Sequence, residues 1–253
     1  MNLTPDSFYA NSRMESSQKV VDKAGAFIEE GASIIDIGGQ STRPGAIMIS
    51  EEEEIERVTG AIESISKVFP IVKLSIDTFQ SKVAKAAIEA GATIVNDISC
   101  GSFDPEILEV VAQYKVGYVG MHITGTKDTM HVIPERTDII EELIHFFTQK
   151  KQLLADKGIQ DWVIDPGFGF GKTIQDNFTI IKDLRKLAII QLPILIGVSR
   201  KSSIYKTLGI SAEEALNGTT VVNTIALKNG ASILRVHDVK EARQAITLME
   251  YLQ

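Results

Sequence analysis

The chain has 253 residues, of which 44% are hydrophobic and 23% are charged, an ordinary composition for a globular protein with a large core. Its net charge of -7 and pI of about 5.2 argue against a broad surface for nucleic acid or membranes. The chain has a single cysteine, Cys100, and shows no signal-peptide pattern. It also has no apolar run near the roughly 18–20 residues that span a bilayer. These features predict a cytoplasmic protein without nucleic-acid or membrane partners.

Three segments resemble one another and predict parallel strands. They cover residues 29–39, 89–99 and 228–238, and each reads as a helix end, a Gly, an Ala and an apolar run that stops at a polar residue. Aligning them superposes Asp36, Asn96 and Arg235. Four further apolar runs end alike, at Asp77, His122, Asp165 and Ser199–Arg200. The sequence therefore predicts seven buried strands with polar residues at their ends.

Helical patterns alternate with these strands, near residues 16–30, 51–68, 80–90, 104–113, 138–157, 175–187, 211–228 and 239–252. Ser50 and Glu53 form the pattern of a capping box before the second helix, and the four glutamates 51–54 are expected to be its solvated first turn. No linker or low-complexity segment interrupts the alternation. We therefore expect a single domain over residues 1–253.

Repeated βα units of this size indicate an open doubly wound sheet or a closed (β/α)8 TIM barrel in the α/β class. Polar residues follow essentially every predicted strand, which favours the barrel, because an open sheet would gather them near one switch point. The first strand of such a barrel is expected directly before Asn2, so that strand is apparently missing from this chain.

The stretch WVIDPGFGFGKT, residues 162–173, predicts a ligand-binding loop after a strand. Its glycines allow close approach of the backbone to a ligand. It matches neither the phosphate loop, which needs Gly where Pro166 stands, nor the dinucleotide pattern, which needs Gly where Lys172 stands. For Lys172 we expect no more than neutralisation of a nearby acid.

The carboxyl ends of barrel strands meet at one mouth. This mouth would gather Asn2, Asp36, Asp77, Asn96, His122, Asp165, Lys201, Arg235 and His237, and the polar loops 4–13 and 38–50 are expected to act as lids. Acids and amides pair with the edge of a flat heterocycle, whereas Arg43, Arg200, Arg235 and His237 suit phosphate. Together they suggest a phosphorylated heterocycle as substrate.

Plainer interpretations remain open for single residues. A strand-end acid such as Asp165 often only caps the next helix, and His122 equally suits a hydrogen bond to a neighbouring strand. Met121 and Ile98 are most simply core residues. No His, Cys or Glu spacing resembles a zinc site. Ser199 and Ser202 could act as nucleophiles only with an oriented histidine, and nothing in the sequence supplies that pairing.

The motifs NLTPDSF (2–8), STRPG (41–45), SIDT (75–78), VND (95–97), DPGFGFGK (165–172), SRKS (199–202) and RVHD (235–238) occur in this order. Together they resemble the dihydropteroate synthase family over essentially the whole chain. The resemblance implies a (β/α)8 barrel that joins 6-hydroxymethyl-7,8-dihydropterin pyrophosphate to p-aminobenzoate, releasing pyrophosphate and 7,8-dihydropteroate. It also implies Mg²⁺ as cofactor, a homodimer, and inhibition by sulfonamides that imitate p-aminobenzoate.

The resemblance also assigns residues to three subsites. The pterin edge would meet Asp77, Asn96, Asp165 and Lys201, in a slot lined by Ile98, Met121, Gly169 and Phe170. The pyrophosphate would meet Asn2, Arg43, Arg235 and His237, with Mg²⁺ on Asn2. The p-aminobenzoate would lie against Thr42, Arg43, Pro44, Phe170, Lys201 and Ser202. The catalytic residues implied are Asp77, Asp165, Lys201, Arg235 and His237.

The first loop departs from the family pattern, because Tyr9-Ala10-Asn11-Ser12 stands where Ser-Asp-Gly-Gly is usual. This departure and the apparently missing strand leave a catalytically silent pterin-binding protein or a truncated fragment as the alternative. A pterin-dependent methyltransferase is a weaker alternative, since such an enzyme has no pyrophosphate to bind.

Overall fold

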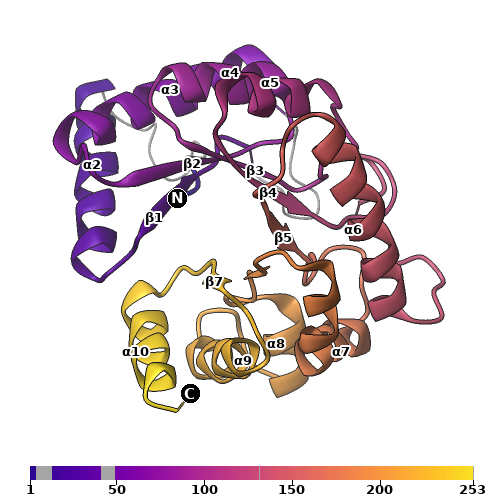
Figure 1. The fold of residues 1–253 in the computed structure, drawn as a ribbon. Coiled ribbons are helices and arrows are strands. Elements are labelled where there is room, and N and C mark those ends of the chain that lie inside the picture. Colours follow the sequence, from indigo (N-terminus) through magenta and orange to yellow (C-terminus); the bar gives the residue numbers. More distant parts are fainter. Residues whose placement is uncertain (4–12, 41–48, 131, 253) are drawn as a thin grey trace. The chain divides into compact units, whose positions relative to one another are not determined.

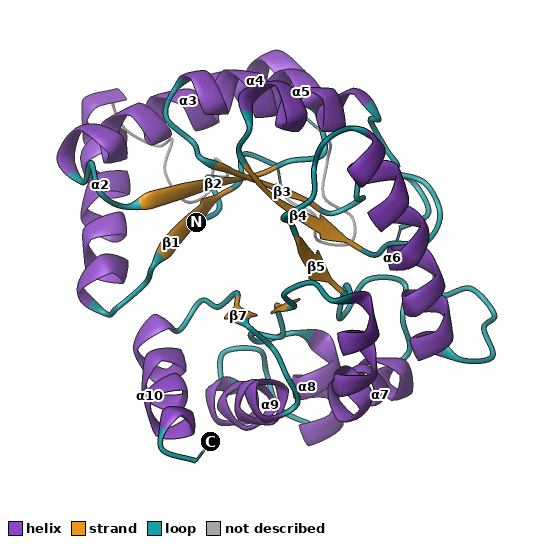
Figure 2. Cartoon of the chain, in the orientation of Figure 1, coloured by secondary structure: helices purple, strands orange, loops and turns teal. Residues whose placement is uncertain are grey.

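A computed structural model describes residues 1–3, 13–40, 49–130 and 132–252. Helices and parallel strands alternate along the chain, as Figures 1 and 2 show. The chain divides into two compact units, one of Met1–Val119 with Lys157–Ile159 and one of Gly120–Asp156 with Gln160–Gln253, and each is described by itself. The expectation of a single domain stays a prediction.

The first unit is built on adjacent parallel strands. β1 (Ile34–Ile37) pairs with β2 (Lys73–Asp77), and β2 pairs with β3 (Ile94–Asp97). β4 (Gly117–Met121) contributes residues to both units, and its first N–H donates to the carbonyl of Thr93 at 2.9 Å. Inward-facing residues such as Ile37, Ile76 and Val95 are fully buried. The core of this unit therefore lies along these strands.

Four helices of the first unit pack beside these strands (Figure 1). They are α2 (Arg13–Glu29), α3 (Glu51–Val68), α4 (Ser81–Glu89) and α5 (Glu106–Tyr114). Ser50 caps α3 by accepting from the N–H of Glu53 at 3.2 Å, which confirms one half of the predicted capping box, while the Glu53 side chain pairs with Arg57. The apolar stripe of α3 is fully buried at Val58, Ile62 and Ile65, which ties this helix to the core.

The prediction that glutamates 51–54 form a solvated turn is wrong for Glu54. Its side chain is only 1% exposed and accepts a hydrogen bond from Gln80 Nε2 at 2.6 Å. Burial raises the pKa of Glu54. Glu54 falls on the inward face because it lies four residues before the fully buried Val58, one helical turn away.

The second unit continues the alternation. Its elements are α6 (Ile139–Asp156), β5 (Val163–Asp165), α7 (Ile174–Asp183), the 3₁₀ helix η1 (Leu184–Ile190), β6 (Leu195–Ile196), α8 (Ser202–Leu208), α9 (Leu216–Lys228), β7 (Ile233–Leu234) and α10 (Val239–Glu250). Ile164 of β5 bridges Ile194 in parallel, and β6 pairs with β7 in parallel. Polar residues at the ends of β5, β6 and β7 are thereby brought to one edge.

The seven predicted strands are all present, and the helices differ in detail. α8 was not predicted, the helix expected over 211–228 begins at Leu216, and the one expected over 175–187 ends as a 3₁₀ segment. None of the helices in the described ranges is long and apolar enough to cross a membrane.

Candidate active site

In the first unit, acids and amides cluster where β1, β2 and β3 end. Asp77 is the register partner of Asn96, and Asn96 Nδ2 donates to Asp36 Oδ2 at 3.2 Å. Asn96 is 7% exposed, so its side-chain amide is largely shielded from water. The three side chains predicted at neighbouring strand ends are therefore adjacent, and they offer both donors and acceptors.

Residues 1–3 lie against the end of β1. Asn2 bridges Gly38 in parallel, with the Leu3 N–H donating to the Gly38 carbonyl at 2.8 Å. A Cβ on Gly38 would lie 3.4 Å from Cβ of Asp77. The exposed side chain of Asn2 is thus carried on backbone that is held near Asp77.

The turn after β3 is held by a buried carboxylate. Asp97 is fully buried and accepts from the Ser99 N–H (2.7 Å), the Gly101 N–H (2.6 Å) and the Tyr118 hydroxyl (2.9 Å). Burial raises the pKa of Asp97, and these hydrogen bonds oppose that effect. Ile98, between Asn96 and this turn, is buried. Asp97 was not predicted as a site residue, although it ends the VND motif.

In the second unit, β5 ends at Asp165 and runs into the glycine-rich loop. Asp165 is 8% exposed and accepts from the Gly167 N–H at 2.8 Å. Burial raises the pKa of Asp165, while the cations Lys201, Lys172 and Arg235 act in the opposite direction. A buried carboxylate near three cations can stay ionised and pair with a polar ligand edge.

Lys201 and Phe170 form the other side of this loop. Lys201, the N-cap residue of α8, donates through Nζ to the Phe168 carbonyl. The same ammonium lies 4.6 Å from the centroid of the Phe170 ring, within cation–π range. Gly169 has φ +85, a conformation that favours glycine, and a Cβ there would lie 2.8 Å from Cδ of Lys201. The predicted neighbours Asp165, Gly169, Phe170 and Lys201 are thus brought together.

The side chain of His122 contacts helix α6 and not the neighbouring strand that its plainer interpretation named, whereas its backbone N–H donates to the Asp165 carbonyl of β5 at 2.8 Å. Its ring is 2% exposed, and Nε2 lies 3.2 Å from Glu142 Oε1. Burial lowers the pKa of His122 to about 4. Glu142 also pairs with Arg136 at 2.9 Å, and Arg136 reaches Asp176 of α7 at 3.1 Å. These contacts connect the end of β4 to α6 and α7.

The cationic residues predicted for phosphate separate into two groups. His237 follows β7, and its Nδ1 lies 3.0 Å from Oγ of Ser199. His237 and Arg235 are both exposed. Arg200, by contrast, pairs with both carboxylate oxygens of Asp238 at 2.9 Å and donates to the Ala212 carbonyl. Arg200 is therefore a structural cation that joins the end of β6 to the start of α10, not a member of the expected phosphate group.

Three further predicted residues fall outside the description. Thr42, Arg43 and Pro44 lie in the undescribed range 41–48. Most of the predicted lid 38–50 lies in that range too, and most of the predicted lid 4–13 lies in the undescribed range 4–12. Ser202 is the first residue of α8 and is half-buried, and Met121 ends β4 as a buried residue.

Lys172 is the residue whose place the sequence analysis missed. It is 6% exposed and donates through Nζ to the carbonyls of Phe170 (3.0 Å) and His122 (3.5 Å). Burial lowers the pKa of Lys172 to about 7. The only signal in the sequence was its position at the end of the glycine run.

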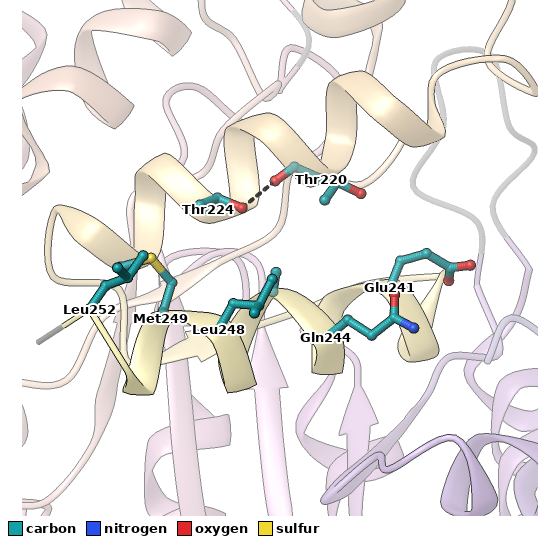
Figure 3. A pocket seen from close by; sticks show the side chains of 8 residues that line it. Thr220, Thr224, Glu241, Gln244, Leu248, Met249 and Leu252 are labelled. Carbon is teal, nitrogen blue, oxygen red and sulfur yellow. Dashed lines mark hydrogen bonds between the residues drawn. The ribbon is translucent and has the colours of Figure 1, made fainter.

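A groove of about 290 Å³ lies between α9 and α10 (Figure 3). Figure 3 shows Thr220 and Thr224 of α9 facing Gln244, Leu248 and Met249 of α10, with a hydrogen bond from the Thr224 hydroxyl to the Thr220 carbonyl. None of the predicted site residues lines this groove, so we do not assign it to the candidate site.

Comparison with known proteins gives one consistent result. The family model described as pterin binding enzyme matches residues 1–237. A dihydropteroate synthase from Synechocystis sp. is 40% identical over 100% of this chain and 88% of its own. The solved dihydropteroate synthase of Xanthomonas albilineans with 4-aminobenzoic acid has a TM-score of 0.91 and 36% identity, covering 100% of this chain and 90% of that one. The solved Yersinia pestis dihydropteroate synthase with a sulfonamide drug complex has a TM-score of 0.90 and 35% identity, covering 99% and 91%.

The relative and the two solved structures are similar to this chain over 99–100% of its length. They also confirm the predicted α/β class and TIM-barrel fold. The chain belongs to the dihydropteroate synthase family of pterin-binding enzymes.

Proposed function

We infer that this protein is a dihydropteroate synthase of folate biosynthesis. The enzyme transfers a pterinylmethyl group from 6-hydroxymethyl-7,8-dihydropterin pyrophosphate to p-aminobenzoate, giving 7,8-dihydropteroate and pyrophosphate. The observation that carries this inference is the loop after β5, where buried Asp165 lies near Lys201 and Lys201 stacks on Phe170. That arrangement offers a polar edge and an aromatic face, which a flat heterocycle needs.

For the pterin, we assign Asp77, Asn96, Asp165 and Lys201 to the polar edge, with Ile98, Met121, Gly169 and Phe170 lining the slot. The support is chemical. Asn96 and Asp165 are buried at strand ends, and Ile98 and Met121 are buried apolar residues beside such ends. Asp77 and Asp165 carry the negative charge that opposes a developing pterin cation.

For the pyrophosphate, we assign Asn2, Arg43, Arg235 and His237. Arg235 and His237 are exposed on the segment after β7, and a guanidinium suits phosphate oxygens because it presents a fork of donors. For p-aminobenzoate, we assign Thr42, Arg43, Pro44, Phe170, Lys201 and Ser202. Lys201 then contributes to both substrates through its place between Phe168, Phe170 and the start of α8.

The reaction needs no protein nucleophile. The bond between the pterin methylene and the pyrophosphate oxygen breaks, and the electron pair leaves with oxygen. The arylamine nitrogen then forms the new C–N bond and releases one proton to solvent. Arg235 and His237 stabilise the leaving charge, whereas Asp77 and Asp165 stabilise the cationic pterin. Catalysis in this scheme rests on positioning and electrostatics.

We propose Mg²⁺ as the cofactor, with Asn2 as its protein ligand. An exposed side-chain amide oxygen fits Mg²⁺, which often takes few protein ligands together with substrate phosphates and water. Among the described residues, no group of three or more His, Cys, Asp or Glu is placed to hold a metal. When bound, Mg²⁺ supplies positive charge that favours pyrophosphate departure.

We also propose a cytoplasmic homodimer with small-molecule substrates and without nucleic-acid or membrane partners. The reduced, buried Cys100 suits a reducing compartment, and the negative net charge disfavours polyanions. Analytical ultracentrifugation at micromolar concentration tests the dimer, for which a single species of twice the chain mass is expected.

The function is tested by following pyrophosphate release with both substrates present. Release is expected to require both substrates, to stop when EDTA removes divalent cations, and to return when Mg²⁺ is added in excess. Binding of the pterin pyrophosphate without p-aminobenzoate-dependent release would instead support the catalytically silent alternative.

A further inference from the structure

Lys172 lies inside the glycine-rich loop rather than on its surface. Its ammonium donates to the carbonyls of Phe170, within the loop, and of His122, at the end of β4. A Cβ on Gly167 would lie 3.0 Å from Nζ of Lys172 and would overlap the carbonyl oxygen of His122. Through these two hydrogen bonds, the buried lysine connects the loop to the end of β4.

The loop is held at several points by side chains of different elements. Asp165 accepts from the Gly167 N–H at 2.8 Å, and Asn177 of α7 accepts from the Gly169 N–H at 2.7 Å. Lys201 donates to the Phe168 carbonyl and lies over the Phe170 ring. Lys172 fixes the backbone of Phe170, whose ring Lys201 contacts. The two lysines thus hold different parts of one ligand-facing residue.

Burial makes protonation of Lys172 costly, and the surrounding charges act in both directions. Asp165 and Glu142 favour the ammonium, whereas Arg136 and Lys201 oppose it, and the side chain is 6% exposed. His122, whose carbonyl it contacts, has a lowered pKa of about 4 and is neutral above that pH. Burial and two nearby cations destabilise the charged form of Lys172, whereas its carbonyl partners and the nearby carboxylates stabilise it.

We propose that Lys172 is a positioning residue of the synthase reaction, which holds Phe170 and Gly169 in the conformation that receives p-aminobenzoate and the pterin. It acts through the loop and does not touch either substrate. The proposal rests on the proposed function and adds a residue to it. Since the pKa of Lys172 is about 7, the charged form that binds the two carbonyls best is lost as the pH rises above 7.

The test compares Lys172→Met and Lys172→Gln with wild type in steady-state assays from pH 6 to 8.5. We expect Lys172→Met to raise the KM for p-aminobenzoate about tenfold at pH 6.5, with kcat changed less than about threefold, because the charge-assisted contacts to the Phe170 and His122 carbonyls are lost. In wild type, that KM should rise between pH 7 and 8.5. In both variants it should be flat, which separates the lysine from titration of the substrate pyrophosphate.

Lys151→Met is the matched control. Lys151 of α6 also donates to a backbone carbonyl, that of Ile190 at 2.6 Å, but its partner lies at the end of η1, outside the candidate site. This variant should lose stability and keep the wild-type KM and its pH profile. If Lys172→Met behaves like Lys151→Met, the positioning role is wrong.

Two further outcomes are decisive. A wild-type KM for p-aminobenzoate that does not change between pH 6 and 8.5 overturns the proposal even if neither Lys172 variant folds. Absence of turnover in wild type would count against the proposed function itself, whereas normal wild-type turnover with unchanged Lys172 variants counts only against the role of Lys172.

Discussion

Lys201 and Arg235 carry positive charge in different settings, and the proposed roles differ accordingly. Lys201 is half-buried, bonded to the Phe168 carbonyl and stacked on Phe170, whereas Arg235 is exposed just beyond β7. Both act on the charge of Asp165. Lys201, which shapes the pocket, should therefore affect the binding of both substrates. Arg235, which we propose binds the leaving group, should affect the binding of the pterin pyrophosphate alone.

Alanine substitutions separate these roles. Arg235→Ala should raise the KM for the pterin pyrophosphate about 10- to 100-fold, the size expected for a lost charge-assisted contact, and leave the KM for p-aminobenzoate within about threefold. Lys201→Ala should raise both KM values. Lys206→Ala, at an exposed position in the last turn of α8, is the control and should have no effect. Wild-type kinetics for Arg235→Ala and Lys201→Ala would refute the assignment.

The buried imidazole of His122 makes a pH-dependent contribution to stability. Its pKa is about 4 in the folded protein and near 6.5 in the unfolded chain. Between these values the unfolded state binds more protons, so the free energy of unfolding falls as pH falls from 6.5 towards 4. The slope is about 1.4 kcal/mol per pH unit, for a total of about 3 kcal/mol.

His122→Gln should remove this part of the pH dependence, because Gln does not titrate and its amide can still donate to Glu142. Urea unfolding at pH 7, 6, 5 and 4.5 measures the difference between the two proteins. Parallel stability curves for wild type and the variant would show that folding does not lower the pKa of His122.

At the scale of elements, the loop after β5 depends on glycines with positive φ. Gly167 has φ +71, and a Cβ there would overlap the His122 carbonyl. Gly158 after α6 has a similar φ of +81, but a Cβ there would meet nothing within 4 Å. The two positions share the backbone strain and differ in available space.

Gly158→Ala should therefore cost about 1 kcal/mol of unfolding free energy through strain alone. Gly167→Ala should cost about 3 kcal/mol, because steric overlap adds to the strain, and should raise both KM values by moving Phe170. Thermal or urea unfolding together with kinetics checks both variants. Equal destabilisation by the two substitutions would mean that the loop tolerates the displaced carbonyl.

The elements were largely predictable because each strand is an apolar run that ends in a polar residue. All seven strands, and the closeness of Asp77 to Asn96 and of Asp165 to Lys201, follow that pattern. α8 was missed because SSIYKTL is short and follows the SRK motif without a periodic apolar face. A seven-residue helix is defined by its neighbours more than by its own sequence.

The burial of charged residues was less predictable. Glu54 and Lys172 were expected at the surface or in minor roles, since lysine and glutamate are rarely buried without a partner. The partners that bury them, Gln80 for Glu54 and the His122 carbonyl for Lys172, come from distant parts of the sequence. Local patterns carry no information on such contacts.

At the scale of the whole molecule, the chain carries features for two substrates. The pterin-edge residues alone would also suit a methyltransferase of the wider pterin-binding class. In the assignment that we propose, Arg235 and His237 beyond β7 bind the pyrophosphate and the Lys201–Phe170 pair contacts the aromatic amine. The likeness to named dihydropteroate synthases over at least 99% of this chain favours the same conclusion.

The silent alternative predicts a protein that binds pterin and does no chemistry. The most direct test incubates the purified protein with Mg²⁺, 6-hydroxymethyl-7,8-dihydropterin pyrophosphate and p-aminobenzoate, and quantifies 7,8-dihydropteroate by mass spectrometry with and without a sulfonamide. Our account predicts one dihydropteroate formed per pyrophosphate released, and inhibition by the sulfonamide that excess p-aminobenzoate reverses. Saturable pterin binding with no dihydropteroate formed would contradict it.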